Sequence, residues 1–157
     1  MRSVFDIEYG TLAQNGVELL IFDVDDTLSG HNGPIPGESF ELLDNLSKRF
    51  AVALLSNCSL ERKKELRDMV AGMPILIGGG QGKPDPVSYL KILGRCNAKP
   101  QQAAVIGDRP GVDLWGAMLA GIEERILVEP YSATHDAKKA PPPYRILRGL
   151  ERWLSNI

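Results

Sequence analysis

Apolar runs of strand length alternate with helical segments along most of this chain. Five runs are rich in aliphatic residues and short enough to be strands, and they occupy residues 17–22, 51–57, 75–77, 102–108 and 125–130. Segments with helical spacing of apolar residues separate them, at 38–50, 59–70, 87–96 and 112–122. Strands that alternate with helices form parallel sheets with helices on both faces. We therefore expect a Rossmann-like three-layer α/β/α sandwich with a five-stranded parallel sheet.

Length and composition are those of one ordinary globular domain. The 157 residues are 43% hydrophobic and 24% charged, and the formal net charge is −2. This balance lacks the basic footprint of a nucleic-acid binder. Two cysteines are too few for a disulfide framework, and no segment is apolar enough for a signal peptide or a membrane span. We expect one domain, residues 1–157, in the cytoplasm, with no nucleic-acid partner and with the oligomeric state left open.

Polar clusters directly follow three of the predicted strands. They are DVDDT at 23–27, Ser-Asn at 56–57 and GDRPGVD at 107–113, and a fourth cluster, GKPDP at 82–86, precedes a helix. In doubly wound sheets, ligands bind outside the carboxyl ends of the strands, where the strand order reverses. We therefore expect the polar side chains of these clusters to converge there. They are Asp23, Asp25, Ser56, Asn57, Lys83, Asp108 and Asp113.

This set of side chains predicts phosphoryl chemistry. Several carboxylates close together need a counter-charge to stay ionised, and an all-oxygen set suits Mg²⁺ better than Zn²⁺. Asp23 is a candidate nucleophile, and Asp25 can protonate the leaving oxygen and later activate water. Ser56, Asn57 and Lys83 supply the donors and the cation that a phosphoryl group needs.

Four motifs resemble the signatures of the haloacid dehalogenase (HAD) superfamily of phosphatases. They are FDVDDTL, LLSN, the lysine of GKPDP and IGDRPGVD, which occur in this order within about residues 17–130. Any one of these motifs is weak, whereas the ordered set is specific. The resemblance implies an enzyme that hydrolyses phosphomonoesters with Mg²⁺ through an aspartyl-phosphate. It also implies that Ser56 and Lys83 hold the phosphoryl group.

The resemblance further implies a role for each acidic residue of these motifs. Asp23 would be both the nucleophile and a metal ligand. Asp25 would be the general acid and base, and would bind the metal through its backbone carbonyl. Asp108 would be a metal ligand, and Asp113 would support the metal or orient Lys83.

The spacing of the motifs leaves no room for the cap domain that HAD enzymes usually carry. Residues 28–55 and 57–82 are already needed for predicted turns, helices and strands. A capless site is open and favours a bulky substrate such as a lipid, a protein or a polymer end, unless a partner subunit covers it. A closer resemblance, in SVFDIEYGTLAQNGVELLIFDVDDTL, ILVEPYS and a basic C-terminal stretch, is to the capless class IIIA subgroup. That subgroup includes phosphatidylglycerophosphate phosphatases, which implies a lipid substrate.

The chain departs from that subgroup at two places, so other substrates stay open. The subgroup often has Asn where this chain has Asp26, and commonly reads GDQ…TD…GGNR where this chain has GDRPGVDLWGAML. One alternative is a phosphatase of a soluble sugar, nucleotide or amino-acid phosphate. An alternative of another class is a HAD-fold binding module without turnover.

Residues outside the predicted site receive simpler interpretations. Asp26, Arg109 and His31 are interpreted as solvated neighbours, and Cys58 as a packing residue. Segment 144–157 has apolar residues on one helical face with arginines beside them. We expect this helix to pack on the sheet after a linker at 135–144. The alternative is weak contact with an anionic membrane surface, which would make the protein peripheral to a membrane.

Overall fold

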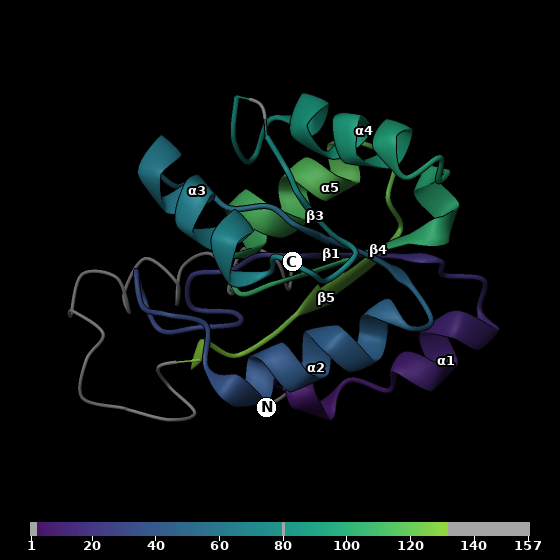
Figure 1. Ribbon diagram of the computed structural model, residues 1–157. Helices are drawn as coiled ribbons and strands as arrows, with labels where there is room; N and C mark the ends of the chain where they lie inside the picture. Colours follow the sequence, from purple (N-terminus) through teal and green to yellow (C-terminus); the bar gives the residue numbers. More distant parts are fainter. Residues whose placement is uncertain (1–2, 80, 132–157) are drawn as a thin grey trace.

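Five parallel strands form the centre of the computed structural model, which describes residues 3–79 and 81–131 (Figure 1). The strands are β1 (Leu19–Phe22), β2 (Ala51–Leu54), β3 (Ile75–Ile77), β4 (Ala103–Gly107) and β5 (Glu124–Leu127). This confirms the predicted five-stranded parallel sheet. The predictions for segments 135–144 and 144–157 lie outside the described residues.

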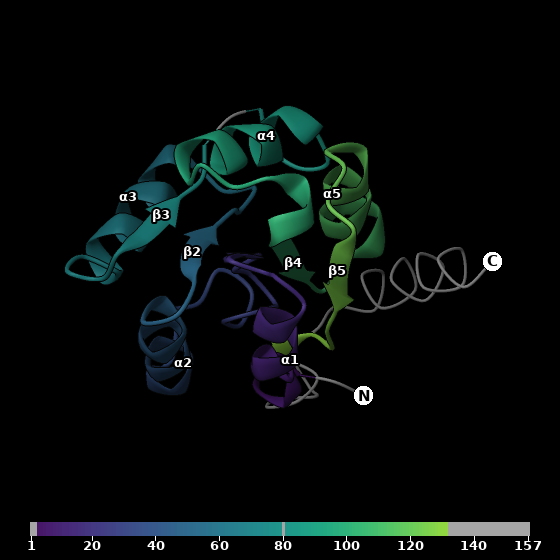
Figure 2. The same cartoon turned by 90° about the vertical axis from the view of Figure 1, so that its right-hand side faces the viewer.

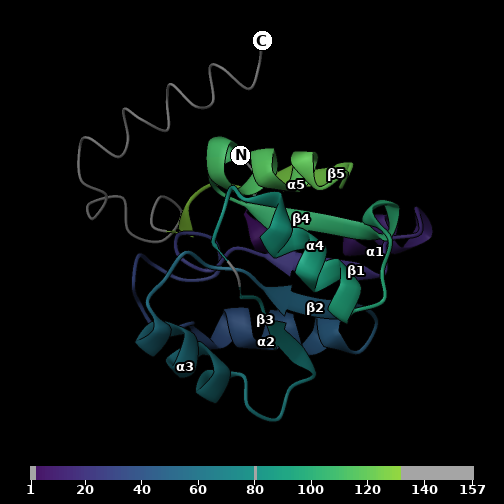
Figure 3. The same ribbon diagram turned by 90° about the horizontal axis from the view of Figure 1, so that it is seen from above.

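The strand order reverses beside β1. The order across the sheet is β3-β2-β1-β4-β5, which Figure 3 shows from above. Leu19 pairs with Ala51 of β2 on one side and with Ala103 of β4 on the other. The chain moves outward from β1 to β3 and then crosses back to β4, so the carboxyl ends of β1 and β4 lie at the switch point.

The continuous apolar sequence of β1 follows from its central place. Alternate side chains of a strand point to opposite faces. Leu20 and Phe22 belong to one buried cluster, and Leu19 and Ile21 belong to the cluster on the other face, all with 1% exposure or less. Because both faces are covered, neither set of side chains can be polar without a buried partner.

Helices cover both faces of the sheet, as Figure 2 shows edge-on. The first face is covered by α1 (Tyr9–Gln14), α2 (Gly37–Ser47) and α3 (Leu60–Met69), whose buried residues join the cluster of Leu20 and Phe22. The second face is covered by α4 (Pro86–Arg95) and α5 (Trp115–Leu119). The three-layer sandwich predicted from the sequence is therefore confirmed.

Two helices begin next to a side chain that caps them. Ser59 precedes α3, and its hydroxyl accepts a hydrogen bond from the backbone N–H of Arg62. Asp85 does the same for Val87 at the start of α4, where Pro86 occupies the first turn. Such caps satisfy N–H groups that a helix cannot pair internally.

Several local features differ from the predictions. Helix α1 was not predicted, because its sequence YGTLAQ offers only one buried apolar residue, Leu12, and so carries little periodicity. Short 3₁₀ turns at Val4–Asp6 and Pro100–Gln102 were also not predicted. The helix expected at 112–122 begins instead as a π-helical turn, η3 (Pro110–Leu114), and ends at Leu119.

The connections between the strands are short. One helix lies between β1 and β2, and one between β2 and β3, so no cap domain is evident in the described part of the chain. Within residues 3–79 and 81–131, none of the helices combines the length and apolarity that a membrane crossing requires.

Candidate active site

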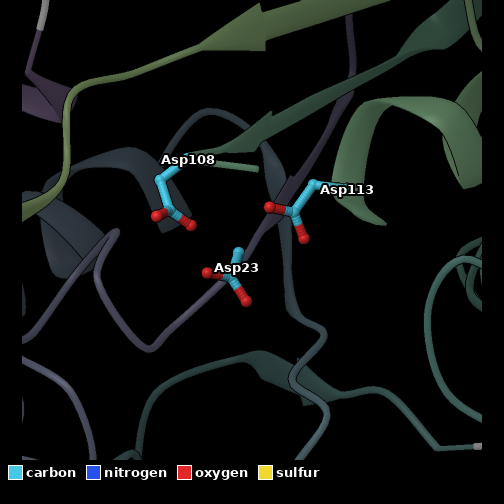
Figure 4. A group of neighbouring side chains, drawn as sticks. All are labelled: Asp23, Asp108 and Asp113. Carbon is cyan, nitrogen blue, oxygen red and sulfur yellow. The ribbon is translucent and has the colours of Figure 1, made fainter. Parts of the chain in front are cut away.

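Three aspartates converge beside the switch point of the sheet. Asp23 follows β1, Asp108 follows β4, and Asp113 lies in η3. One carboxylate oxygen from each lies within 4.8 Å of the others, and Figure 4 shows the three side chains beside one another. All three residues are buried, with exposures of 8% for Asp23 and 1% for each of the other two. Burial of three carboxylates this close together requires compensating positive charge.

Lys83 supplies part of that charge. Its ammonium contacts Asp23 Oδ1 and lies 2.6 Å from Asp113 Oδ1. Burial alone would lower the pKa of Lys83, but the two carboxylates outweigh burial and raise the pKa, so the ammonium stays charged. Burial also raises the pKa of Asp113, and the Asp23 charge adds to this rise, while Lys83 opposes it.

Asn57 fixes the backbone of Lys83. Its side-chain Nδ2 donates to the Lys83 carbonyl at 2.7 Å, and its Oδ1 accepts from the Lys83 N–H at 2.6 Å. The preceding Gly82 has φ +93°, and a Cβ there would lie 2.9 Å from Asn57 Oδ1. The amide of Asn57 therefore positions the lysine, while its predicted contact with substrate stays a prediction.

Thr27 is a buried site residue to which the sequence analysis gave no role. Its hydroxyl donates to Asp23 Oδ2 at 3.0 Å and lies 3.5 Å from Asp108 Oδ1. The residue is 2% exposed. The sequence signal that could have found it is its place in DVDDT, four residues after Asp23. One turn of chain over these residues brings the Thr27 side chain back toward the end of the strand.

Asp25 is directed toward a second set of donors. Ser56 Oγ donates to Asp25 Oδ2 at 3.2 Å, and the backbone N–H of Asn32 donates to Asp25 Oδ1 at 3.1 Å. Arg62 Nη2 lies 3.9 Å from the same Oδ1. Sequence reasoning missed Arg62, because it lies in a highly charged helix that is typical of a solvated surface.

Residues beside these aspartates also enter the site. Asp26 is only 3% exposed and has a φ of +67°. Its Oδ2 lies 3.3 Å from His31 Nδ1. Its interpretation as a solvated neighbour was therefore wrong. Arg109 is half-buried, and its backbone N–H donates to Asp113 Oδ2 at 3.0 Å. Cys58 packs against the first buried cluster, as predicted.

A cavity of about 130 Å³ opens over the site. Its lining includes most of the predicted site residues, namely Asp23, Asp25, Ser56, Asn57, Lys83 and Asp113. The rest of the lining is Asp26, His31, Asn32, Arg109 and Val112. Asp108 lies behind the lining at 1% exposure. The fold thus gathers all seven predicted residues around one small polar opening, although their individual roles stay predictions.

The donor set of the site fits a magnesium ion. Asp23, Asp108 and Asp113 offer only carboxylate oxygens, which are the ligands that hard divalent cations prefer. Asp23 and Asp108 are the side-chain ligands that the sequence predicts. Asp113, predicted to have a supporting role, also offers an oxygen within 4.8 Å of theirs.

Solved structures define the fold class. A HAD-like family hydrolase from Porphyromonas gingivalis superposes with a TM-score of 0.61, at 13% identity, over 85% of this chain and 98% of that one. A haloacid dehalogenase-like family hydrolase from Xanthomonas campestris gives 0.52, at 13% identity, over 91% and 100%. At these identities the likeness concerns the fold alone, and the fold is that of HAD-like hydrolases.

Sequence comparison points to the same superfamily. The family model described as HAD-hydrolase-like matches residues 80–152. A phosphoserine phosphatase from Thermus thermophilus is 35% identical over 97 residues, which are 57% of this chain and 39% of that protein. The match therefore spans well under half of that relative's length. In both fold and sequence, this chain is therefore similar to HAD-like hydrolases.

Proposed function

We propose that this chain is a Mg²⁺-dependent phosphomonoester hydrolase that acts through an aspartyl-phosphate on Asp23. The observation that carries the proposal is the buried group of Asp23, Asp108 and Asp113, held within 4.8 Å, with the Lys83 ammonium against two of its members. Such a concentration of charge costs folding free energy. Binding of a divalent cation and a phosphate would explain why the protein keeps this costly cluster.

The first step transfers the phosphoryl group to the protein. An oxygen of Asp23 bonds to phosphorus as the bond to the ester oxygen breaks, and Asp25 donates a proton to that leaving oxygen. The Thr27 hydroxyl donates to Asp23 Oδ2 and so helps to fix the nucleophile. The Lys83 ammonium lies beside Asp23, where negative charge gathers on the phosphoryl oxygens.

The second step releases inorganic phosphate. Asp25, now ionised, takes a proton from water as the water oxygen bonds to phosphorus and the bond to Asp23 breaks. Ser56 and Lys83 are the proposed donors to the phosphoryl oxygens in both steps. In the present structure the Ser56 hydroxyl donates to Asp25, so it lies next to the acid and base.

Magnesium would be held by the side chains of Asp23 and Asp108 and by the backbone carbonyl of Asp25. When bound, the ion neutralises the negative charge of the phosphoryl group and so lets a carboxylate approach it. Asp113 lies close enough to share in holding the ion, and it already contacts Lys83.

Two substrate classes fit different observations. The motif resemblance to class IIIA and the lack of a cap among the described residues favour a bulky ester such as phosphatidylglycerophosphate. The similarity to a phosphoserine phosphatase favours a small soluble phosphate ester. A panel comparing phosphatidylglycerophosphate in mixed micelles with phosphoserine, sugar phosphates and nucleoside monophosphates separates them by kcat/KM.

The decisive test of the proposed function uses a chromogenic phosphate monoester. Turnover should require Mg²⁺ and stop on addition of EDTA, and acid-quenched protein should carry a phosphoryl group on Asp23. Asp23→Asn should abolish both turnover and labelling while the circular dichroism spectrum stays unchanged. Turnover that survives EDTA or Asp23→Asn would contradict the proposal. Absence of turnover with the whole panel would favour the binding-module alternative.

A further inference from the structure

Arg62 is a largely buried cation whose role is not explained by surface solvation. Its side chain is 12% exposed, although it lies in the charged helix α3. Its Nη2 donates to the Gly33 carbonyl, and its Nη1 lies 3.1 Å from Glu65 Oε2. Its Nε is buried and has no hydrogen-bond partner in the part of the chain that the structure describes. Burial of this kind is costly for arginine unless it serves a specific contact.

The start of α3 directs Arg62 toward the site. Ser59 caps the helix and accepts a hydrogen bond from the Arg62 N–H at 3.2 Å. Ser56 lies three residues before this cap, at the end of β2. The same short segment therefore places the Ser56 hydroxyl on one oxygen of Asp25 and the Arg62 guanidinium near the other.

Arg62 also joins Asp25 to the loop that follows it. Nη2 is 3.9 Å from Asp25 Oδ1 and donates to the carbonyl of Gly33. The backbone N–H of Asn32, one residue before, donates to that same Oδ1 at 3.1 Å. The guanidinium thus lies against both the Asp25 carboxylate and the loop whose Asn32 N–H binds that carboxylate.

Lys83 and Arg62 lie beside different aspartates. The Lys83 ammonium contacts Asp23 and Asp113, whereas the Arg62 guanidinium lies near Asp25. The Asp25 carboxylate also contacts the Ser56 hydroxyl and the backbone N–H of Asn32. Arg62 places a positive charge 3.9 Å from Asp25 Oδ1, on the side of α3.

We propose that Arg62 is a positioning residue for Asp25, which sets the direction from which Asp25 exchanges protons. This inference rests on the proposed function, in which Asp25 protonates the leaving oxygen. A misdirected acid matters most when the leaving group is a poor one, because a good leaving group departs without protonation. Loss of Arg62 should therefore change the dependence of rate on the leaving group rather than lower all rates equally.

The test measures kcat/KM for phosphate monoesters with a graded series of leaving groups, from nitrophenyl to alkyl. This constant reports the steps up to phosphoryl transfer, so the common second step does not enter it. Arg62→Ala should lose roughly 10- to 100-fold with alkyl esters and much less with nitrophenyl phosphate, as removal of part of a general-acid contribution predicts. Arg62→Lys should recover part of the loss.

The matched control is Arg67→Ala, which removes an exposed arginine from the same helix. It should leave kcat/KM unchanged throughout the series. In an Asp25→Asn background, Arg62→Ala should cause no further loss, because the residue it positions is already absent. Equal losses across the series, or a full further loss in that background, would overturn the inference.

Failure of the inference and failure of the proposed function give different results. If the unaltered protein turns over no monoester, the proposed function fails. If it turns over the series and both Arg62 variants behave like Arg67→Ala, only the inference fails. Thermal unfolding identifies a variant that does not fold. If Arg62→Ala does not fold, the leaving-group series measured with Arg62→Lys tests the inference instead.

Discussion

Asp23 and Asp25 lie two residues apart on one loop, yet their surroundings differ. The Asp23 side chain is 9% exposed, and its oxygens are held by the Lys83 ammonium and the Thr27 hydroxyl. The Asp25 side chain is 17% exposed, and it accepts hydrogen bonds from Ser56 and from a backbone N–H. One carboxylate is fixed within a buried charge network, and the other is held at the edge of the cavity.

Under the proposed function, this difference would prepare the two carboxylates of one short motif for two tasks. A nucleophile must be fixed in direction, and the contacts of Asp23 restrict its orientation. An acid and base must reach both the substrate and water, which partial exposure of Asp25 permits. In this proposal, environment rather than residue type separates the two roles. The following variants test that separation, beginning with the largest expected effect.

Replacing each carboxylate by its amide should separate their roles. Asp23→Asn should lower kcat by at least about 10⁴-fold, because the nucleophile is lost. Asp25→Asn should retain phosphoryl transfer from nitrophenyl phosphate but slow hydrolysis of the intermediate, so that phosphorylated protein accumulates. Acid-quench labelling measures this directly. An equal loss of kcat in both variants, with no phosphorylated protein in Asp25→Asn, would show that the two residues do not have separate roles.

Removing the buried cation should destabilise the protein without metal. Lys83→Met leaves Asp23 and Asp113 buried beside each other and should lower the free energy of unfolding by about 3–5 kcal/mol. Urea unfolding in EDTA measures the change. The double variant Lys83→Met/Asp113→Asn is the control, and it should regain part of the loss because one negative charge is gone. An unchanged midpoint in Lys83→Met would contradict the charge network.

Gly107→Ala should disturb the Asp23 network through Asp113. A Cβ at Gly107 would lie 2.6 Å from atoms of the Asp113 side chain, so this side chain must move. Overpacking of this kind costs about 1–3 kcal/mol. We expect a lower unfolding free energy and a higher Mg²⁺ concentration for half-maximal rate. Gly10→Ala, where nothing lies within 4 Å of the new methyl, is the matched control and should change neither quantity in that direction.

Ser59→Ala should have the smallest effect, and it should affect the surroundings of Asp25 rather than those of Asp23. Loss of the cap on α3 should cost about 1 kcal/mol in unfolding free energy. Ser59→Asn, which can still accept the Arg62 N–H, should retain most of that stability. If Ser59→Ala also alters the leaving-group dependence, the start of α3 contributes to the placement of Arg62.

The strands and the main motifs are the parts that the sequence predicts well. The strand at Ile75–Ile77 agrees residue for residue, and β1, β2, β4 and β5 lie within or close to their predicted ranges. These elements have strong signals because a central parallel strand is apolar on both faces. The convergence of the seven candidate residues also follows from position, because the polar clusters that contain them follow strands or precede a helix at one edge of the sheet.

The residues that the sequence missed depend on contacts rather than on pattern. Arg62 lies in a helix with only one fully buried residue, Leu66, so the local pattern gives no sign that Arg62 is buried. Its burial depends on the contact with the loop at Gly33. Asp26 is buried because the chain turns through a positive φ, which an aspartate pattern alone does not reveal. Helix α1 is stabilised by packing of Leu12 on the sheet, a tertiary contribution absent from local propensity.

The pairing of the Asn57 amide with the Lys83 backbone resembles a pair of strand hydrogen bonds made by a side chain. It anchors the lysine to the end of β2, so the lysine does not depend on β3 alone for its location. Insertions or deletions between Gly79 and Gly82 should therefore be tolerated better than their nearness to the reaction centre suggests. Length variation in this stretch should leave the pairing of Asn57 with Lys83, and with it the charged centre, in place.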